Sequence, residues 1–259
     1  IADSKLATKR ILTRHNLPTP GLVKVFKGHE DINDFSWLGL PDNFVFKPCS
    51  GFGGEGILVI RKKSRFAGEW ELMNGETITI SDLKFHAQEI LSGRYSLHNT
   101  PDQAFIEERV KVIKVFSKYV KGGTPDIRVI VFNMVPVMAM LRLPTEESDG
   151  KANLHQGAVG VGIDLASGVT TYGIHHGRPV NYLPGTRTKV NGLRIPFWEQ
   201  ILLHSVRTQE VIPSLGYLGI DFLIDRNKGP LIVELNARPG LSIQVANRAG
   251  LQKRLERVE

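Results

Sequence analysis

Two strand-like runs near the C-terminus constrain this chain most, because together they gather oxygen donors on one surface. Residues 218–224 and residues 231–236 are rich in Leu, Ile and Val, and turn-forming residues separate them. A hairpin through that turn would place Asp221 opposite Glu234. Asn236 would share their face, because alternate strand residues point to the same side of a sheet. The sequence therefore predicts an antiparallel hairpin that carries three oxygen donors.

These three donors are of the kind that Mg²⁺ or Mn²⁺ prefers. Mg²⁺ is usually held by a few protein oxygens and keeps positions for water and substrate phosphates. The apolar residues around Asp221 and Glu234 predict a buried strand and favour a metal site. The alternative is an acidic hairpin with a solvated face.

A second strand–turn–strand pattern, residues 44–60, has the features of a phosphate cradle. Its turn contains Gly51, Gly53 and Gly54, and Lys47 stands at the end of its first strand. Glycines let backbone N–H groups approach an anion, and a lysine adds a point charge. No helix pattern follows the glycines, which disfavours a P-loop or a dinucleotide-binding turn. A glycine-rich hairpin without a ligand is the open alternative.

Composition narrows the class of protein. The chain has 259 residues and a single cysteine, Cys49, so an intrachain disulfide is impossible and a reducing compartment is expected. No apolar run approaches the roughly 20 residues that span a bilayer. No signal peptide is visible, although the chain opens without Met, so we expect a cytoplasmic protein with no membrane partner. The net charge of +7 is dispersed, which favours a site for phosphate and carboxylate groups over nucleic-acid binding.

The order of the expected elements predicts an α+β fold with mainly antiparallel sheets. Helices and strands alternate early in the chain, whereas hairpins dominate later. We expect helices at 4–16, 31–38, 81–92 and 196–215, strands at 22–26 and 104–110, and hairpins formed by 129–134 with 136–143 and by 159–163 with 169–173.

A series of short motifs in chain order resembles the ATP-grasp superfamily, and most closely its RimK-like and alpha-L-glutamate ligase-like members. The resemblance implies two α+β subdomains that clasp ATP: an N-terminal helix at 1–21, a small subdomain at 22–106, and a C-terminal subdomain at 107–259 with the metal site. A further domain that usually precedes this helix is expected to be absent or truncated. The motifs are residues 3–9, 46–48, 105–110, 126–128, 140–142, 152–158, 219–221 and 234–240.

The resemblance also implies which residues hold the nucleotide. Lys5 and Lys47 would neutralise phosphate oxygens. Lys5 could instead be an exposed helix lysine, because Lys9 offers a competing register. Glu107, Glu108 and Val110 would read the adenine edge and the ribose. Adjacent strand residues point to opposite faces, so at most one of the two carboxylates faces the nucleotide.

Two arginines are candidates for the reaction centre. Arg142, and with it Arg128, would bind an acyl phosphate or its tetrahedral adduct, because the guanidinium fork is bidentate. An arginine in an apolar strand more often pairs with a structural acid, and Asp126 is a candidate partner for Arg128.

The remaining candidates are polar groups in loops. Asn153 and His155 would contact phosphate and the incoming substrate. Arg238 and Gly240 would bind a substrate carboxylate, and Arg238 departs from the RimK-like ligases, which carry a small residue there. The adjacent histidines 175 and 176 lack metal-ligand spacing with other candidates, and we interpret them as loop residues.

Together these features predict an ATP-dependent carboxylate–amine ligase that forms an amide through an acyl phosphate. The partners would be a small-molecule carboxylate, with an amino acid such as glutamate expected, and an amine on a peptide, a protein terminus or a metabolite. The alternatives are an ATP-grasp phosphotransferase and a non-catalytic ATP-binding module. The sequence decides neither the substrates nor the oligomeric state.

Overall fold

The computed structural model describes residues 4–51, 53–119 and 123–258. The chain divides into two compact units. The smaller consists of Ser4–Leu6 with Pro20–Arg109, and the larger of Ala7–Thr19 with Val110–Glu259. Helix α1 (Lys5–Arg14) contributes residues to both.

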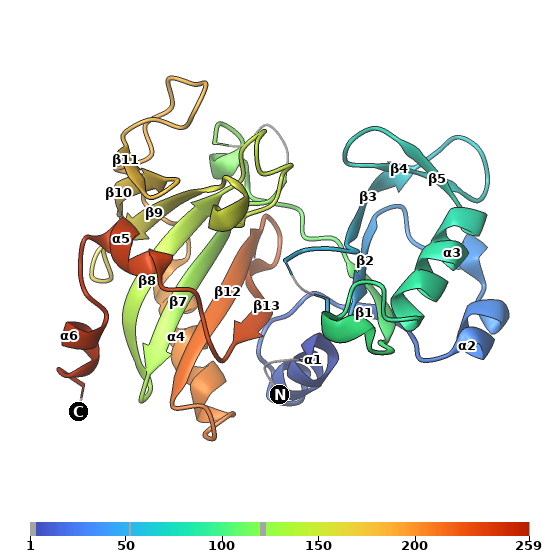
Figure 1. Ribbon diagram of the computed structural model, residues 1–259, viewed down its shortest axis with the longest axis horizontal. Coiled ribbons are helices and arrows are strands. Elements are labelled where there is room, and N and C mark those ends of the chain that lie inside the picture. Colours follow the sequence, from blue (N-terminus) through green and yellow to red (C-terminus); the bar gives the residue numbers. More distant parts are fainter. Residues whose placement is uncertain (1–3, 52, 120–122, 259) are drawn as a thin grey trace. The chain divides into compact units, whose positions relative to one another are not determined.

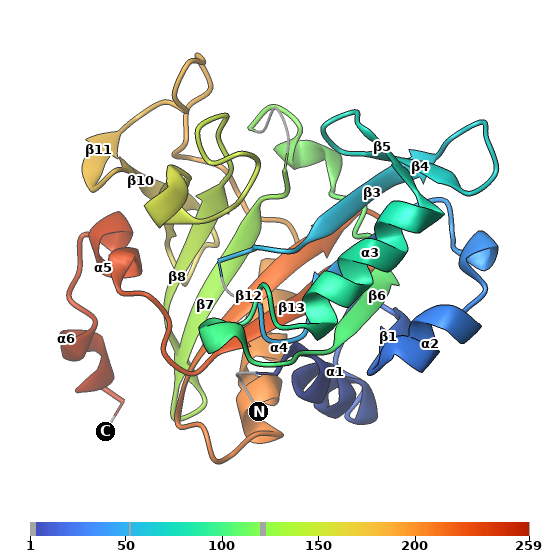
Figure 2. The ribbon, with the colours of Figure 1, turned by 45° about the vertical axis from the view of Figure 1, so that its right-hand side comes forward.

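The smaller unit is built on a six-stranded antiparallel sheet with the order β1-β6-β2-β3-β4-β5. Helix α3 lies along this sheet (Figures 1 and 2). The elements are β1 (Leu22–Phe26), α2 (His29–Asp34), β2 (Phe44–Pro48), β3 (Leu58–Lys63), β4 (Glu69–Leu72), β5 (Thr77–Thr79), α3 (Ile80–Leu91) and β6 (Ala104–Glu108), with short 3-10 turns at Trp37–Gly39 and Leu97–Asn99.

Helix α3 shows how local sequence sets this packing. Thr79 and Asp82 form a reciprocal capping box, so the helix begins at Ile80 and not at the predicted Ser81. Its apolar side chains recur at helical spacing and pack into the core of the smaller unit. The buried residues of this face are Leu83, Ala87, Ile90 and Leu91.

The larger unit is built on a seven-stranded antiparallel sheet with the order β11-β10-β9-β8-β7-β12-β13. The elements are β7 (Asp126–Phe132), β8 (Val135–Leu143), β9 (Val159–Ile163), β10 (Thr170–His175), β11 (Arg178–Val180), α4 (Trp198–Glu210), β12 (Tyr217–Asp225), β13 (Gly229–Asn236), α5 (Ser242–Asn247) and α6 (Gln252–Leu255), with 3-10 turns at Lys114–Phe116 and Leu154–Gln156. The predicted α+β fold with antiparallel sheets is confirmed.

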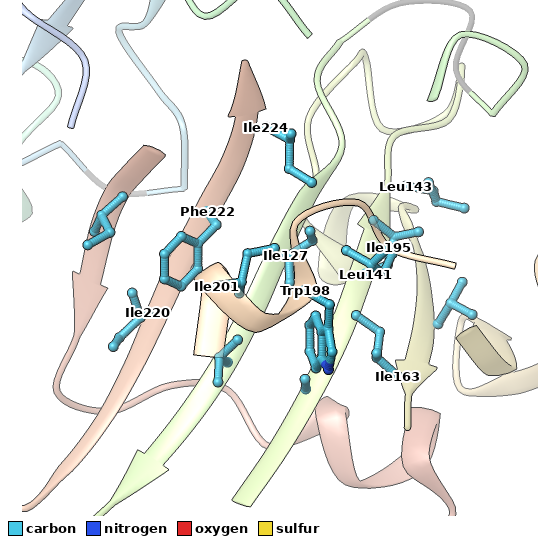
Figure 3. Close-up of a cluster of buried hydrophobic side chains, with 14 of the residues drawn as sticks. Ile127, Leu141, Leu143, Ile163, Ile195, Trp198, Ile201, Ile220, Phe222 and Ile224 are labelled. Carbon is cyan, nitrogen blue, oxygen red and sulfur yellow. The ribbon is translucent and has the colours of Figure 1, made fainter. Parts of the chain in front are cut away.

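The alternation of side chains along the strands of this sheet produces one apolar face and one partly polar face. Ile127, Leu141 and Ile220 belong to the face that packs against Trp198 and Ile201 of α4 (Figure 3). Burying each such side chain contributes about 1.5–3 kcal/mol. The neighbouring positions along the same strands point to the opposite face. Part of that face is apolar and packs against α5, and the rest carries charged side chains.

The observed boundaries correct some expectations. The strands predicted at 22–26 and 159–163 are confirmed. The helix predicted at 31–38 is wrong in extent, because Phe35 adopts an extended conformation after α2 and Trp37 begins a separate 3-10 turn. The indole of Trp37 donates to the carbonyl of Ile32 at 2.9 Å, which holds this break in place. Within the described ranges, no helix combines the length and apolar character needed to cross a membrane.

Candidate functional site

The hairpin of β12 and β13 has the register expected from the sequence. Asp221 pairs with Glu234, and Gly219 pairs with Asn236. A β-bulge follows Asp221, so that Phe222 pairs with Ile232. Such a bulge re-aims the side chains beside it. Asp221, Glu234 and Asn236 are thereby carried by one stretch of the hairpin.

Strands β7 and β8 extend this polar row across the sheet. Arg128 of β7 is the pairing partner of Asp221, and Asp126 of β7 is the pairing partner of Arg142 on β8. Directly opposed residues on antiparallel strands have neighbouring side chains. Four adjacent strands therefore bring two arginines and three carboxylates to one region of the sheet.

The two arginines and two of the aspartates form a connected network. Arg128 donates from Nε and Nη2 to the two carboxylate oxygens of Asp221, each at 2.7 Å. Arg142 binds Asp126 in the same way, at 2.5 and 2.6 Å, and its Nη2 also reaches Oδ2 of Asp221 at 2.6 Å. The sequence suggested Asp126 as a partner for Arg128, but the hydrogen bonds go to Arg142, because strand register places Asp126 and Arg142 opposite each other.

Burial makes this network electrostatically strong. The side chain of Asp221 is only 2% exposed, and those of the two arginines are about a tenth exposed. Burial alone would raise the pKa of Asp221, but the charges of Arg128 and Arg142 outweigh burial and lower that pKa to about 2. Burial and repulsion from Asp221 raise the pKa of Asp126 to about 6 against the attraction of Arg142.

The donor set fits a hard divalent cation. An ionised carboxylate has about four lone-pair positions, and the three arginine bonds to Asp221 place one on Oδ1 and two on Oδ2. Oδ1 therefore keeps acceptor capacity. With Glu234, which is partly buried, Asp221 supplies carboxylate oxygens of the kind that Mg²⁺ prefers. Asn236 presents its Nδ2 to Asp221 at 3.4 Å, so its amide must turn over to place its oxygen beside theirs.

In the smaller unit, Lys47 and Glu107 form a buried ion pair. Lys47 Nζ lies 2.5 Å from Glu107 Oε1, with side chains 16% and 5% exposed. The pair follows from the register, since Lys47 of β2 and Glu107 of β6 lie on neighbouring strands. Glu108 points away and is exposed, and its Oε2 accepts from the Gly21 N–H at 3.2 Å.

The glycine-rich turn joins β2 to β3, which pair antiparallel as predicted. Gly53 and Gly54 have φ values of 64° and 82°, in the left-handed region that favours glycine. A Cβ at Gly51 would lie 2.3 Å from Cγ of Pro48, so this position also requires glycine. Lys5 Nζ donates to the Gly51 carbonyl at 2.9 Å, whereas Lys9 donates to Thr19. Phe52, inside the turn, lies outside the described residues.

The other predicted site residues lie outside these two groups. Val110 comes after the end of β6, where the chain passes from the smaller to the larger unit. Asn153 caps a 3-10 turn by accepting from the N–H of His155 at 3.0 Å, and His155 itself is exposed. Arg238 and Gly240 are exposed residues between β13 and α5.

One group of side chains was not found from the sequence. Glu147, His175 and His176 offer ligand atoms that all lie within 4.8 Å of one another. The interpretation of the two histidines as plain loop residues is wrong for His175, which ends β10. Spacing along the chain gave no signal, because Glu147 lies far upstream, after β8, and only the fold brings it to the histidines.

Three solved structures share this fold at low sequence identity. Biotin carboxylase from Campylobacter jejuni matches 98% of this chain with a TM-score of 0.60 and 13% identity, over 45% of its own length. D-alanine–D-alanine ligase from Bacillus anthracis matches 99% with a TM-score of 0.52 and 17% identity, over 67% of its length. L-amino acid ligase from Bacillus licheniformis matches 95% with a TM-score of 0.50 and 14% identity, over 43% of its length. These likenesses show a shared fold.

No curated protein sequence matches the chain. Its whole length, residues 1–259, matches a family described as sugar-transfer associated ATP-grasp. The seven-stranded sheet with its acidic hairpin and the six-stranded sheet with its glycine-rich turn therefore belong to a protein of the sugar-transfer associated ATP-grasp family.

Proposed function

We propose that the protein is an ATP-dependent carboxylate–amine ligase that works through an acyl phosphate. The observation that carries the proposal is the buried row of guanidinium and carboxylate groups formed by Arg128, Arg142, Asp126, Asp221 and Glu234 on four adjacent strands. With a divalent cation bound, a row of this kind can neutralise phosphate oxygens and position a reacting carboxylate, and no covalent nucleophile is needed.

Each part of the row has a proposed task. Asp221, Glu234 and Asn236 would hold Mg²⁺ or Mn²⁺, which supplies positive charge to phosphate oxygens when bound. In the smaller unit, Lys47, Lys5 and the backbone N–H groups of the glycine-rich turn at Gly51, Gly53 and Gly54 would bind the phosphates. Glu107 or Glu108, with backbone groups near Val110, would bind the ribose and the adenine edge.

Arg142 is the proposed contact to the acyl phosphate. Its described hydrogen bonds use Nε and Nη2. A guanidinium carries five N–H donors, so we assign the donors on Nη1 to the intermediate. Three bonds to Asp126 and Asp221 fix the plane of the guanidinium, so it needs no reorientation when charge develops on the substrate. Arg128 would position Asp221 and add to the positive potential.

The proposed substrate classes rest on the motif resemblance and on the family description. The carboxylate is proposed to be an amino acid, and glutamate comes first because the motifs resemble RimK-like ligases. The family description favours an acceptor linked to sugar transfer, so amino sugars belong beside peptides among the candidate amines. Asn153, His155, Arg238 and Gly240 are proposed to contact these substrates.

The test is ADP formation by the purified protein with Mg-ATP and a matrix of amino acids and amines. We expect ADP release that requires one carboxylate and one amine together, and a product whose mass is their sum less one water. Arg142→Lys keeps the charge but loses the fork, and it should reduce turnover at least tenfold. A stable phosphorylated acceptor would instead support a phosphotransferase, and tight ATP binding without turnover would support a binding module.

A further inference from the structure

We propose that Glu147, His175 and His176 form a binding site for a divalent transition-metal ion, with Zn²⁺ as the best match. Their ligand atoms lie within 4.8 Å of one another in the larger unit. Two imidazoles and one carboxylate are borderline ligands that suit zinc, whereas Mg²⁺ prefers oxygen donors alone. None of the three residues belongs to the set proposed above for magnesium.

The distances between the donors are close to those around a tetrahedral ion. His176 Nε2 lies 2.8 Å from Glu147 Oε1, and His175 Nε2 lies 3.4 Å from Glu147 Oε2. A zinc ion with bonds of about 2.1 Å separates neighbouring tetrahedral ligands by about 3.4 Å. Small rotations of these side chains would therefore complete the geometry.

The hairpin of β10 and β11 aims the two histidines. His176 and Gly177 form its two-residue turn, with φ values of 49° and 73°. Turns of this type favour Asn-Gly, and histidine is among the few other residues enriched at positive φ. The turn places the rings of His175 and His176 with their centroids 4.2 Å apart, so both imidazoles reach the same carboxylate.

The surroundings leave space and acceptors for an ion. Glu147 and His175 line a cavity of about 240 Å³, together with Thr145 and residues 183–186, which has room for a water or anion as the fourth ligand. His175 Nε2 lies 3.0 Å from the Gly157 carbonyl. That carbonyl also accepts from the Thr145 hydroxyl at 2.8 Å, so it keeps a partner if His175 turns to a metal.

An ion at this site would tie two segments together. Glu147 lies in the segment between β8 and β9, and the histidines lie at the end of β10 and in the turn after it. The same segment carries Asn153 and His155. Binding would therefore restrain the loop that holds these two polar residues.

The experiment is a zinc titration against a chromogenic chelator in phosphate-free buffer, without ATP. We expect one zinc ion per chain, and His176→Ala or Glu147→Gln should bind it at least tenfold more weakly. His29→Ala is the matched control, because His29 is an exposed histidine on α2, far along the chain from this cluster, and should leave zinc affinity unchanged. Circular dichroism checks that each variant is folded, as expected for exposed positions.

A second readout identifies the coordination. Co²⁺ should give the intense visible absorption typical of a four-coordinate site in the wild type but not in His176→Ala. Three results would overturn the proposal: no zinc binding by the wild type at micromolar concentrations, equal affinity in His176→Ala, or displacement of zinc by millimolar Mg²⁺. Because no nucleotide is present, failure here is separate from failure of the ligase proposal.

Discussion

The substitution Asp221→Asn tests whether the buried arginine network depends on this carboxylate charge. The fold lowers the pKa of Asp221 from 3.8 to about 2, which corresponds to about 2 kcal/mol in favour of the charged form. The asparagine is nearly isosteric, so no cavity forms. Breaking a buried ion pair by removing one partner usually costs about 3–5 kcal/mol.

We expect the lower end of that range, about 3 kcal/mol. Asp126 remains beside both arginines, and the loss of repulsion from Asp221 should lower the pKa of Asp126 and strengthen its bonds to Arg142. For a unit of this size the midpoint of thermal unfolding should fall by about 6–12 °C. The unfolding transition of the larger unit, followed by calorimetry at pH 7, measures both quantities.

The pH dependence has a defined sign. A depressed aspartate pKa contributes stability that is complete above the unfolded value near 4 and is lost as the pH falls through about 2. The wild type and Asp221→Asn should therefore converge in stability between pH 4 and pH 2. Equal stability of the two proteins at pH 7 would refute the proposed charge balance.

A matched control separates stability from function. Asp225 lies on the same face of β12 and is buried, but it accepts backbone N–H groups of Lys111, Asn227 and Lys228 instead of arginines. Asp225→Asn should lower the free energy of unfolding by about 1 kcal/mol and should leave ADP formation intact. Asp221→Asn should lose ADP formation even at temperatures where it is folded.

Three further predictions concern other parts of the molecule. Lys47→Met should weaken Mg-ADP binding by about 10- to 100-fold in calorimetric titrations, as expected for the loss of one charge-assisted phosphate contact. Lys63→Met, which changes an exposed lysine on β3, should leave Mg-ADP affinity unchanged. Equal Mg-ADP affinities of Lys47→Met and the wild type would remove Lys47 from the phosphate site. Burial lowers the pKa of His86, so stability should fall as the pH drops below 6.5, by at most about 1.4 kcal/mol per pH unit. Denaturant unfolding of His86→Gln should show less of this slope, and an unchanged slope would contradict the assignment. Gly162→Ala should lower the free energy of unfolding by about 1–3 kcal/mol, because its Cβ would lie 2.4 Å from the carbonyl oxygen of Ala246. Gly250→Ala should leave the free energy of unfolding nearly unchanged, because open space surrounds that position.

Local sequence patterns predicted the helices and strands whose conformation depends on residues close in sequence. The hairpin with Asp221 opposite Glu234 could be derived because apolar alternation and a turn signal leave few registers open. The helix expected at 31–38 failed where backbone geometry at Phe35 and the bond from Trp37 outweighed propensity. Position along the chain alone did not reveal these competing interactions.

Long-range partners were harder to predict than the elements that carry them. The sequence suggested an ion pair of Asp126 with Arg128, two residues away, because it did not fix the register between β7 and β8. In the sheet, Asp126 lies opposite Arg142 and accepts hydrogen bonds from it. Glu147, which follows β8, and the two histidines, at the end of β10 and in the turn after it, are brought together only by the fold. Such groupings need the register of a whole sheet, which single-sequence patterns do not determine.

The ligase proposal is tested most directly by following an oxygen atom. If a carboxylate attacks the γ-phosphate of ATP and an amine then displaces phosphate, one carboxylate oxygen must end in inorganic phosphate. With the active amino acid labelled by ¹⁸O in its carboxylate, mass spectrometry should find one ¹⁸O in the phosphate released with each ADP. Phosphate that carries no label while amide forms, or label that stays wholly in the amino acid while ATP is consumed, would contradict the acyl-phosphate route.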